Sequence, residues 1–395
     1  MGRYCFDEIV PRRGTGSVKW DEFESDALPM WVADMDFKAA PEILDALQKR
    51  LDHGVFGYQL VPDAYYDAIA KWFRERHGWT GFGKENVICT TGVIPAYSAC
   101  IKAFAKPGEK VIMMTPCYNA FFPAVRNNKC VESHNPLLIE DGRCRIDFED
   151  LERKAADPEA TVLLLCNPHN PTGRVWTREE LLRVAEICLR NGVFVISDEI
   201  HCELTYPGHD YTPYGTLPDE YVWNSASCIS PTKAFNIAGI QIANIVAKDP
   251  EKVRKIDRAI NDNECCDVNV FGVTALMAAY GEGGEWLDEL RAYLYENYLT
   301  VKEFLAKELP FVKVLPLEGT YLLWLDCRAF RKADEPEEGF SVRLADHLRK
   351  HARLIFSTGT IYGPEAEGYE RMNIACPRKT LLDGLSRLKE GLLSY

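Results

Sequence analysis

Between about residues 85 and 250, short apolar runs alternate with helical patterns, and this alternation constrains the fold more than any other feature. The apolar runs cover residues 86–91, 110–116, 161–167, 193–198, 221–227 and 242–248. Continuous apolar runs bounded by turns are typical of strands that are covered on both faces. Strands that alternate with helices predict a mostly parallel sheet with right-handed crossovers. The chain is therefore predicted to be an α/β protein.

One of the helices has clear signals at both ends. Thr177 is followed three residues later by Glu180, which forms a capping box, and Asn191-Gly192 is a typical helix stop. These signals predict a helix over residues 177–192.

The sequence after residue 283 has a different pattern. Residues 284–310 form an amphipathic helix pattern, and residues 312–327 indicate two strands around a turn at Glu318-Gly319. A further helix pattern, a short strand and a terminal helix follow. This arrangement is typical of an α+β unit. We expect it to pack with the N-terminal segment as a second, smaller domain.

Composition and charge exclude several classes of partner. The chain has 395 residues, 47% hydrophobic and 27% charged, which is typical of a globular protein. A formal net charge of −13 argues against nucleic acid and against an anionic membrane surface. The N-terminus lacks the apolar region of a signal peptide, and no apolar run is long enough to span a membrane. We therefore expect a cytoplasmic protein.

The 14 cysteines favour a reducing compartment, and their spacing does not indicate a metal site. Their spacing is irregular, and several lie in apolar runs, where free thiols behave as small hydrophobes. No Cys-x-x-Cys pair occurs, and the adjacent Cys265-Cys266 is a poor metal site. No bound metal is expected.

In parallel sheets, ligands bind beyond the carboxyl ends of the strands, so the residues that follow each apolar run are candidates. Gly92-Val93-Ile94 follows the first run and opens a helix, whose free N–H groups and dipole suit a phosphate. Asp198 ends a buried run, where a carboxylate needs a cationic partner such as a protonated ring nitrogen. Taken singly, a glycine before a helix is more often an ordinary turn, and a helix N-cap explains Asp198 equally well.

Two further strand ends carry polar groups. The stretch "NPHNPTG" forces a rigid turn that presents the Asn170 amide, although a structural turn is the alternative. The stretch "SPTK" supplies the hydroxyls of Ser230 and Thr232 and the amine of Lys233. A lysine amine can form a Schiff base with a carbonyl, although an ordinary surface lysine is the alternative. Together the four strand ends supply an anion site, a carboxylate, an amide and a lysine. Pyridoxal phosphate needs these four parts.

With these motifs, the chain resembles the fold-type I pyridoxal-phosphate enzymes of the class I/II aminotransferase superfamily. "NPHNPTG", "SDEIH", "SPTKAFNIAG" and "RMNIACPR" come in the family's order and separations, and the resemblance covers nearly the whole chain. It implies a large cofactor-binding domain with a mostly parallel, seven-stranded sheet between helices. It also implies a smaller α+β domain from the N- and C-terminal segments. The implied division is 1–45, 46–283 and 284–395.

Within the superfamily, the chain looks like the cystathionine β-lyase and cysteine C–S lyase branch. The branch motifs are "RRGTGSVKWD", "PMWVADMDF", "FGYQ" and "DEIHCEL". Typical aminotransferases carry Tyr at the position of His201, and many carry Arg at the position of Gln241. These two departures leave the cofactor phosphate with fewer positive charges, so backbone and hydroxyl donors must contribute more to its binding.

The resemblance also implies a role for each motif residue. Lys233 would bind the cofactor's aldehyde and then act as general base, and Asp198 would keep the pyridine nitrogen protonated. Asn170 would bind the phenolic oxygen and assist substrate binding. Arg371 would clamp the substrate carboxylate, helped by the backbone near Ala33. The remaining implied cofactor contacts are Gly92, Val93, Ile94, Ser230, Thr232, Tyr118, His201 and, from the neighbouring subunit, Tyr58.

The implied reaction is β-elimination from cysteine S-conjugates, which yields pyruvate, ammonia and a thiol. Thiolates are stable anions near neutral pH and therefore leave readily. The role of Tyr58 implies a homodimer with shared active sites. Two alternatives stay open: an aminotransferase that uses the same cofactor, and a non-catalytic binding protein on the same fold. No side-chain pattern selects one sulfur substrate, such as cystathionine or cystine.

Overall fold

A seven-stranded sheet forms the centre of the computed structural model, which describes residues 2–140 and 142–395. In spatial order its strands are β2 (Val87–Thr90), β10 (Ala243–Val246), β9 (Ser225–Ile229), β8 (Phe194–Asp198), β7 (Ala160–Cys166), β3 (Lys110–Thr115) and β4 (Val131–Pro136). Strand β10 is antiparallel to both of its neighbours, and all other pairs are parallel. The predicted α/β class and mostly parallel sheet are confirmed.

Two details of the sheet differ from the prediction. Residues expected to start the strand at 221 instead end the short helix α8 (Asp219–Val222), and β9 begins later and continues to Ile229. Strand β4 was not predicted, because its sequence "VESHNP" is polar and alternating. It lies at the edge of the sheet and pairs only with β3, so it needs no continuous apolar run.

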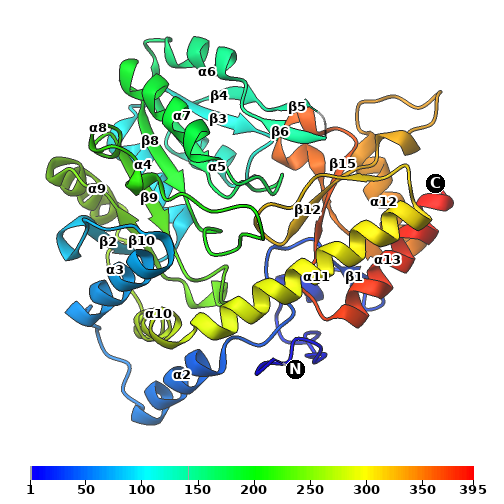
Figure 1. Ribbon diagram of the computed structural model, residues 1–395, viewed down its shortest axis with the longest axis horizontal. Helices are drawn as coiled ribbons and strands as arrows, with labels where there is room; N and C mark the ends of the chain where they lie inside the picture. Colours follow the sequence, from blue (N-terminus) through cyan, green and yellow to red (C-terminus); the bar gives the residue numbers. More distant parts are fainter. Residues whose placement is uncertain (1, 141) are drawn as a thin grey trace.

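Helices cover both faces of the sheet, as Figure 1 shows. Along β7, Val162 and Leu164 belong to one buried cluster, whereas Leu163 and Leu165 belong to the other, which is the alternation of a strand buried on two sides. The covering helices are α4 (Val93–Phe104), α5 (Phe121–Asn127), α6 (Phe148–Ala155), α7 (Arg178–Arg190) and α9 (Pro250–Asp262). The predicted capping box is present at the start of α7.

A second sheet is built from the C-terminal part of the chain. Its strands, in spatial order, are β11 (Lys313–Val314), β12 (Leu322–Asp326), β15 (Tyr369–Asn373) and β14 (Ser357–Thr358). Helices α12 (Phe340–Ala352) and α13 (Arg378–Leu393) pack beside it, and the long helix α11 (Gly284–Glu308) runs across the molecule toward them (Figure 1). Strand β1 (Leu28–Pro29) pairs in parallel with β13 (Leu354–Ile355), so the N-terminal segment joins this unit.

Further helices and one hairpin lie outside these two sheets. They are α1 (Val18–Asp21), α2 (Pro41–His53), α3 (Asp63–His77), α10 (Val270–Glu282) and the hairpin of β5 (Leu138–Glu140) and β6 (Arg143–Arg145). Residue 45, the expected end of the N-terminal segment, falls inside α2, and residue 283 lies between α10 and α11. We propose that the N-terminal segment ends before Pro41 and that the C-terminal unit begins after residue 283. In the part of the chain that the structure describes, no helix has the length and apolarity needed to cross a membrane.

One buried carboxylate makes the stability of the fold depend on pH. Glu370 in β15 is fully buried, and neither of its carboxylate oxygens has a partner among the described residues. Burial, reinforced by the charge of Glu367, raises the pKa of Glu370 well above its ordinary value. The folded state therefore binds a proton that the unfolded chain has lost, so this contribution to stability is present at low pH and is lost as pH rises.

We expect Glu370→Gln to flatten the pH dependence of stability. In the wild type, this group lowers the free energy of unfolding by at most about 1.4 kcal/mol for each pH unit above the ordinary glutamate pKa. The substitution removes this pH-dependent loss. Thermal unfolding of both proteins at about pH 5, 6.5 and 8 measures the difference. Glu338→Gln, which changes an exposed glutamate, is the control. Parallel wild-type and Glu370→Gln curves across this range would contradict the expectation.

Candidate active site

Most of the predicted site residues line one cavity of about 280 Å³ at the carboxyl ends of the strands. Those that line it are Ala33, Gly92, Val93, Ile94, Tyr118, Asn170, Asp198, His201, Thr232 and Lys233. Two others lie directly behind its wall: Arg371 hydrogen-bonds the Asn170 side chain, and Ser230 hydrogen-bonds the Thr232 hydroxyl. The rule that ligands bind at this edge of a parallel sheet therefore located the cavity.

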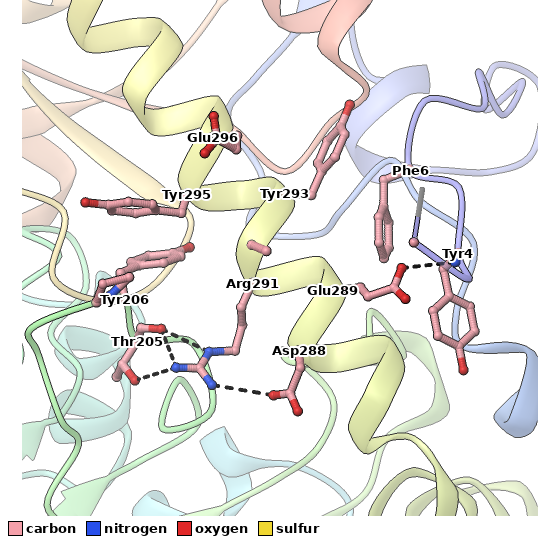
Figure 2. A pocket seen from close by; sticks show the side chains of 13 residues that line it. Tyr4, Phe6, Thr205, Tyr206, Asp288, Glu289, Arg291, Tyr293, Tyr295 and Glu296 are labelled. Carbon is pink, nitrogen blue, oxygen red and sulfur yellow. Dashed lines mark hydrogen bonds and ion pairs between the residues drawn. The ribbon is translucent and has the colours of Figure 1, made fainter.

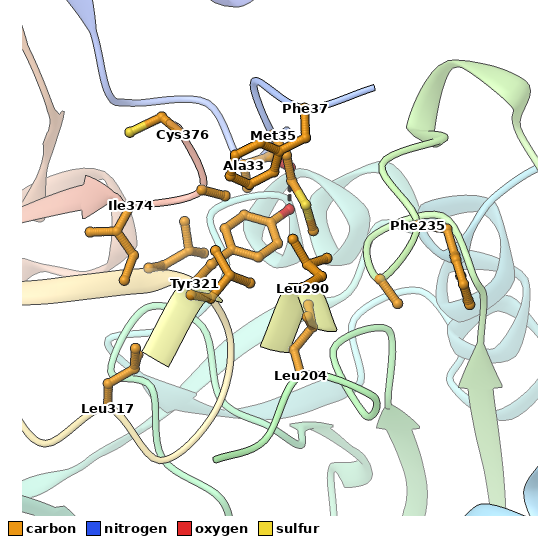
Figure 3. Close-up of a cluster of buried hydrophobic side chains, with 14 of the residues drawn as sticks. Ala33, Met35, Phe37, Leu204, Phe235, Leu290, Leu317, Tyr321, Ile374 and Cys376 are labelled. Atoms are coloured by element: carbon orange, nitrogen blue, oxygen red, sulfur yellow. Dashed lines mark hydrogen bonds between the residues drawn. The ribbon is translucent and has the colours of Figure 1, made fainter. Parts of the chain in front are cut away.

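Lys233 reaches the cavity from the loop after β9. Its Nζ donates a hydrogen bond of 2.6 Å to the backbone oxygen of Ala33. The Tyr321 hydroxyl donates to the same oxygen at 2.9 Å, as Figure 3 shows. Burial and the positive charge of Arg371 together lower the pKa of Lys233 to about 8. About a tenth of this amine is therefore unprotonated at pH 7, against far less for an ordinary lysine, and this fraction is able to attack a carbonyl.

Asp198 and Glu199 are adjacent buried carboxylates with different surroundings. Glu199 accepts hydrogen bonds from the Tyr211 hydroxyl, the Tyr214 N–H and the Ser197 hydroxyl, so it is satisfied within the protein. Asp198 ends β8, accepts one bond from the Ile200 N–H and faces the cavity. Burial raises the pKa of Asp198 to about 7, which means that a cation placed in the cavity would stabilise its charged form.

Arg371 is held from several sides by segments that are distant in sequence. Its Nη1 donates to the Asn170 side-chain oxygen at 3.0 Å, and its Nη2 donates to the Trp31 backbone oxygen at 2.7 Å. The guanidinium lies 4.8 Å from the ring centroid of Tyr362, a cation–π arrangement. Its Nε is buried and has no partner among the described residues. A fixed guanidinium with spare donors is suited to bind a carboxylate.

The turn that carries Asn170 is fixed by buried ion pairs. Gly173 adopts φ of +72°, which glycine tolerates without strain, and its backbone oxygen accepts from the N–H groups of Glu318 and Gly319. The next residue, Arg174, pairs with the carboxylates of Glu318 and Glu180. The turn between β7 and α7 is thereby tied to the C-terminal unit, which brings Asn170 to Arg371.

The cavity also offers donors to an anion. Gly92 is the N-cap of α4, so the N–H groups of Val93 and Ile94 lie at a helix N-terminus, where the dipole favours negative charge. Thr232 adds a hydroxyl to the same cavity, and Gln241 lines it where many aminotransferases carry Arg. The Ser230 hydroxyl instead donates to the Ile242 backbone oxygen at 2.7 Å, so it positions Thr232.

Three rings line the middle of the cavity. Burial lowers the pKa of His201 to about 3, with help from the charges of Lys233 and Arg371, so its imidazole is neutral. Tyr118 lines the cavity as predicted. Tyr97 also lines it, although sequence reasoning missed this residue. Its spacing of four residues from Val93 on a helix that opens at Gly92 is a signal that would have found it.

Tyr58 is the one predicted site residue that lies away from the cavity within the described chain. It is fully exposed on the segment between α2 and α3, where Val55 and Leu60 are also exposed.

A larger cavity, of about 560 Å³, lies beside α11 (Figure 2). Its basic side chain, Arg291, donates to the Thr205 backbone oxygen and contacts Asp288, so that charge is used within the protein.

The first cavity fits pyridoxal phosphate by the chemistry of its donors. The lysine amine matches the aldehyde, and the buried Asp198 carboxylate, which has no cationic partner within hydrogen-bonding distance among the described residues, matches the pyridine nitrogen. The helix N-terminus at Gly92 matches the phosphate. The Asn170 side chain lines the cavity between these groups and also contacts Arg371.

Comparisons with known proteins agree with this geometry. Residues 28–388 match the family model described as aminotransferase class I and II. Cystathionine beta-lyase PatB of Bacillus subtilis is 44% identical over 98% of this chain and 99% of that protein, and protein MalY of Escherichia coli is 34% identical over 98% of both. A crystal structure of cystalysin from Treponema denticola, which contains pyridoxal 5'-phosphate, superposes with a TM-score of 0.94 at 33% identity over 99% of both chains. A pyridoxal-phosphate-bound C–S lyase from Staphylococcus hominis gives a TM-score of 0.91 at 33% identity over 99% of both chains.

Proposed function

Because this chain belongs to the aminotransferase class I and II family, we propose that it is a pyridoxal-phosphate-dependent carbon–sulfur lyase. The reaction is β-elimination from cysteine S-conjugates, and its products are pyruvate, ammonia and a thiol. The observation that carries the proposal is the meeting of Lys233, Asp198 and the Arg371–Asn170 pair around one cavity. The lyase names of the full-length relatives support elimination over transamination.

Each residue has a role that follows from its surroundings. Bound pyridoxal phosphate supplies an aldehyde for the substrate amine and an electron sink for the electrons of the Cα–H bond. Asp198 would hold the proton on the pyridine nitrogen, and the N-terminus of α4 with Thr232 would hold the phosphate. Arg371 would bind the substrate carboxylate and so orient the Cα–H bond.

Lys233 moves the proton that starts the elimination. Its pKa of about 8 leaves the amine able to accept the Cα proton near neutral pH. The electron pair of that bond forms the Cα–Cβ double bond, and the Cβ–S pair leaves with sulfur as a thiolate. The Ala33 backbone oxygen accepts a hydrogen bond of 2.6 Å from the Lys233 amine and so helps to position it at the cavity.

A two-arm assay separates elimination from transamination. The purified protein with its cofactor is incubated with cystathionine, with and without 2-oxoglutarate. We expect pyruvate and free thiol to appear at the same rate in both arms. Turnover that requires the keto acid would instead favour the aminotransferase. No turnover in either arm would favour the non-catalytic alternative.

We also propose a homodimer with shared active sites. The segment between α2 and α3 carries Val55, Tyr58 and Leu60 with exposed fractions of 63%, 103% and 87%. Apolar and aromatic side chains on an extended segment of this kind are suited to pack on a partner surface. In such a dimer, Tyr58 of each chain would reach the phosphate site of the other, which is the role that the resemblance implies.

We also propose a cytoplasmic location. The buried free thiols, such as Cys100 and Cys188, support a reducing compartment.

Subunit complementation tests the shared site. Tyr58→Ala and Lys233→Ala, each expected to be nearly inactive as a homodimer, are co-expressed with different affinity tags, and the mixed dimer is isolated. One of its two sites combines an intact Lys233 with an intact Tyr58 from the neighbour, so we expect about half of the wild-type activity. A mixed dimer as inactive as its parents, or a protein that elutes as a monomer, would contradict the shared site.

A further inference from the structure

A short segment at the cofactor cavity, residues 31–35, belongs to no helix or strand. Ala33, its middle residue, lines the cavity together with Lys233. Within the described chain the segment makes no backbone-to-backbone hydrogen bond, yet each of its backbone oxygens accepts a hydrogen bond from a side chain. Because no sheet or helix fixes this segment, side chains determine where its backbone oxygens point.

Asn373 holds the backbone oxygens on both sides of Ala33. Its Nδ2 donates to the Val32 oxygen at 2.6 Å and to the Asp34 oxygen at 2.7 Å. Its Oδ1 accepts from the Ala375 N–H at 2.7 Å, which fixes the amide in one orientation. The residue is buried, with 1% of its surface exposed. Because each peptide group is planar and turns as a unit, bonds to both neighbouring groups leave the Ala33 carbonyl little freedom to turn.

The Ala33 oxygen is the one hydrogen-bond acceptor for the Lys233 amine among the described residues. The other principal cation of the site has more partners, because Arg371 contacts the Asn170 side chain and the Tyr362 ring as well as a backbone oxygen of the segment. A displacement of the segment would therefore remove the partner of Lys233 and leave Arg371 largely anchored.

We infer that Asn373 is a positioning residue for the proposed elimination, because its bonds on both sides of Ala33 aim that backbone oxygen at Lys233. The inference rests on the proposed function and adds to it a residue that does not line the cavity. A misplacement of about 1 Å can slow a reaction 10²-fold, even when its cause is far from the reacting atoms. Loss of Asn373 therefore slows proton transfer more than it weakens substrate binding.

Asn297 on α11 gives a matched control. Its Nδ2 also donates to two backbone oxygens that are two residues apart, those of Ile374 and Cys376, both at 2.9 Å, and it is fully buried. Its Oδ1 accepts from Arg378, and none of these partners lines the cavity. Asn297→Ala and Asn373→Ala remove the same kind of bonds from the interior, so we expect similar falls in melting temperature.

Steady-state pyruvate release from cystathionine by the holoenzymes is the first measurement. We expect kcat of Asn373→Ala to be at least about tenfold below that of Asn297→Ala, with KM within about threefold of wild type. A smaller difference in kcat, or a loss carried by KM alone, would overturn the inference. If the wild type releases no pyruvate, the proposed function fails, and the second measurement still tests the placement of Lys233.

The second measurement needs no turnover. The full-length apoprotein is mixed with pyridoxal 5'-phosphate at several pH values, and absorbance gives the rate at which the cofactor attaches. Only the unprotonated amine attacks the aldehyde, so the midpoint of this pH dependence reports the Lys233 pKa, about 8 in the wild type. The hydrogen bond to the Ala33 oxygen favours the charged amine, so we expect a midpoint at least about half a pH unit lower in Asn373→Ala. An unshifted midpoint, or an equal shift in Asn297→Ala, would overturn the inference.

A second variant covers the case in which Asn373→Ala does not fold. Asn373→Ser keeps a hydroxyl that can accept from the Ala375 N–H, as serine does in turns, but is too short to bridge two backbone oxygens. Both measurements are repeated on it, with the same directions expected. If neither Asn373 variant folds while Asn297→Ala does, Asn373 maintains the fold and not the site, and the inference fails.

Discussion

Lys233→Ala is expected to abolish elimination, with a fall in kcat of at least about a thousandfold, because one residue supplies two functions. In the proposed function the amine would bind the cofactor covalently, and general-base catalysis alone is worth about 10²–10⁴-fold. The depressed pKa of about 8 and the bond to the Ala33 oxygen are features of an amine kept ready for both functions. Pyruvate release from cystathionine measures the loss.

Two further measurements make the Lys233 prediction specific. Borohydride treatment followed by peptide mapping should place the reduced cofactor on Lys233 in the wild type and on no residue in the variant. Lys248→Ala, which removes a lysine paired with Asp219 at the surface, should keep wild-type activity. Retention of activity in Lys233→Ala, or a cofactor fixed to another side chain, would contradict the covalent role.

Asp198→Asn is expected to lower kcat by about two to three and a half orders of magnitude. Breaking a buried charge pair costs about 3–5 kcal/mol, since it leaves the other charge without a partner. In this chain the partner would be the protonated pyridine nitrogen of the cofactor, and the buried carboxylate has no other cation within hydrogen-bonding distance among the described residues. The Asn side chain keeps the shape of the site, so the fall in kcat measures the contribution of the Asp198 charge. Steady-state kinetics and cofactor titration of the apoprotein measure it.

The neighbouring residue is a natural control for Asp198. Glu199 is equally buried, but its carboxylate is bound by Tyr211, Tyr214 and Ser197 and does not line the cavity. Glu199→Gln should therefore lower the melting temperature and leave kcat within about threefold of wild type, because a hydrogen-bond loss of this kind costs stability. Equal kinetic losses in the two variants would mean that Asp198 acts through the fold and not through the cofactor.

Much of the site can be predicted from the sequence because its residues directly follow strands. Asp198 ends an apolar run, Asn170 lies in the proline-rich turn after another, and Lys233 follows a third. Apolar runs predict strands, and parallel strands end at one edge of the sheet, so a local pattern predicts a shared location. The same reasoning missed β4 and misplaced the start of β9, because an edge strand need not be apolar and a short helix can share the composition of a strand.

The sequence by itself determined the class of fold, the order of the motifs and the residues at the strand ends, since periodicity and turn chemistry are local properties. Only the tertiary structure decided which distant segments complete the site. Ala33 meets Lys233 across 200 residues, and Asn170 meets Arg371 across 201. Such contacts arise when two separately patterned units pack against each other, and no period or spacing along the chain records where their surfaces meet.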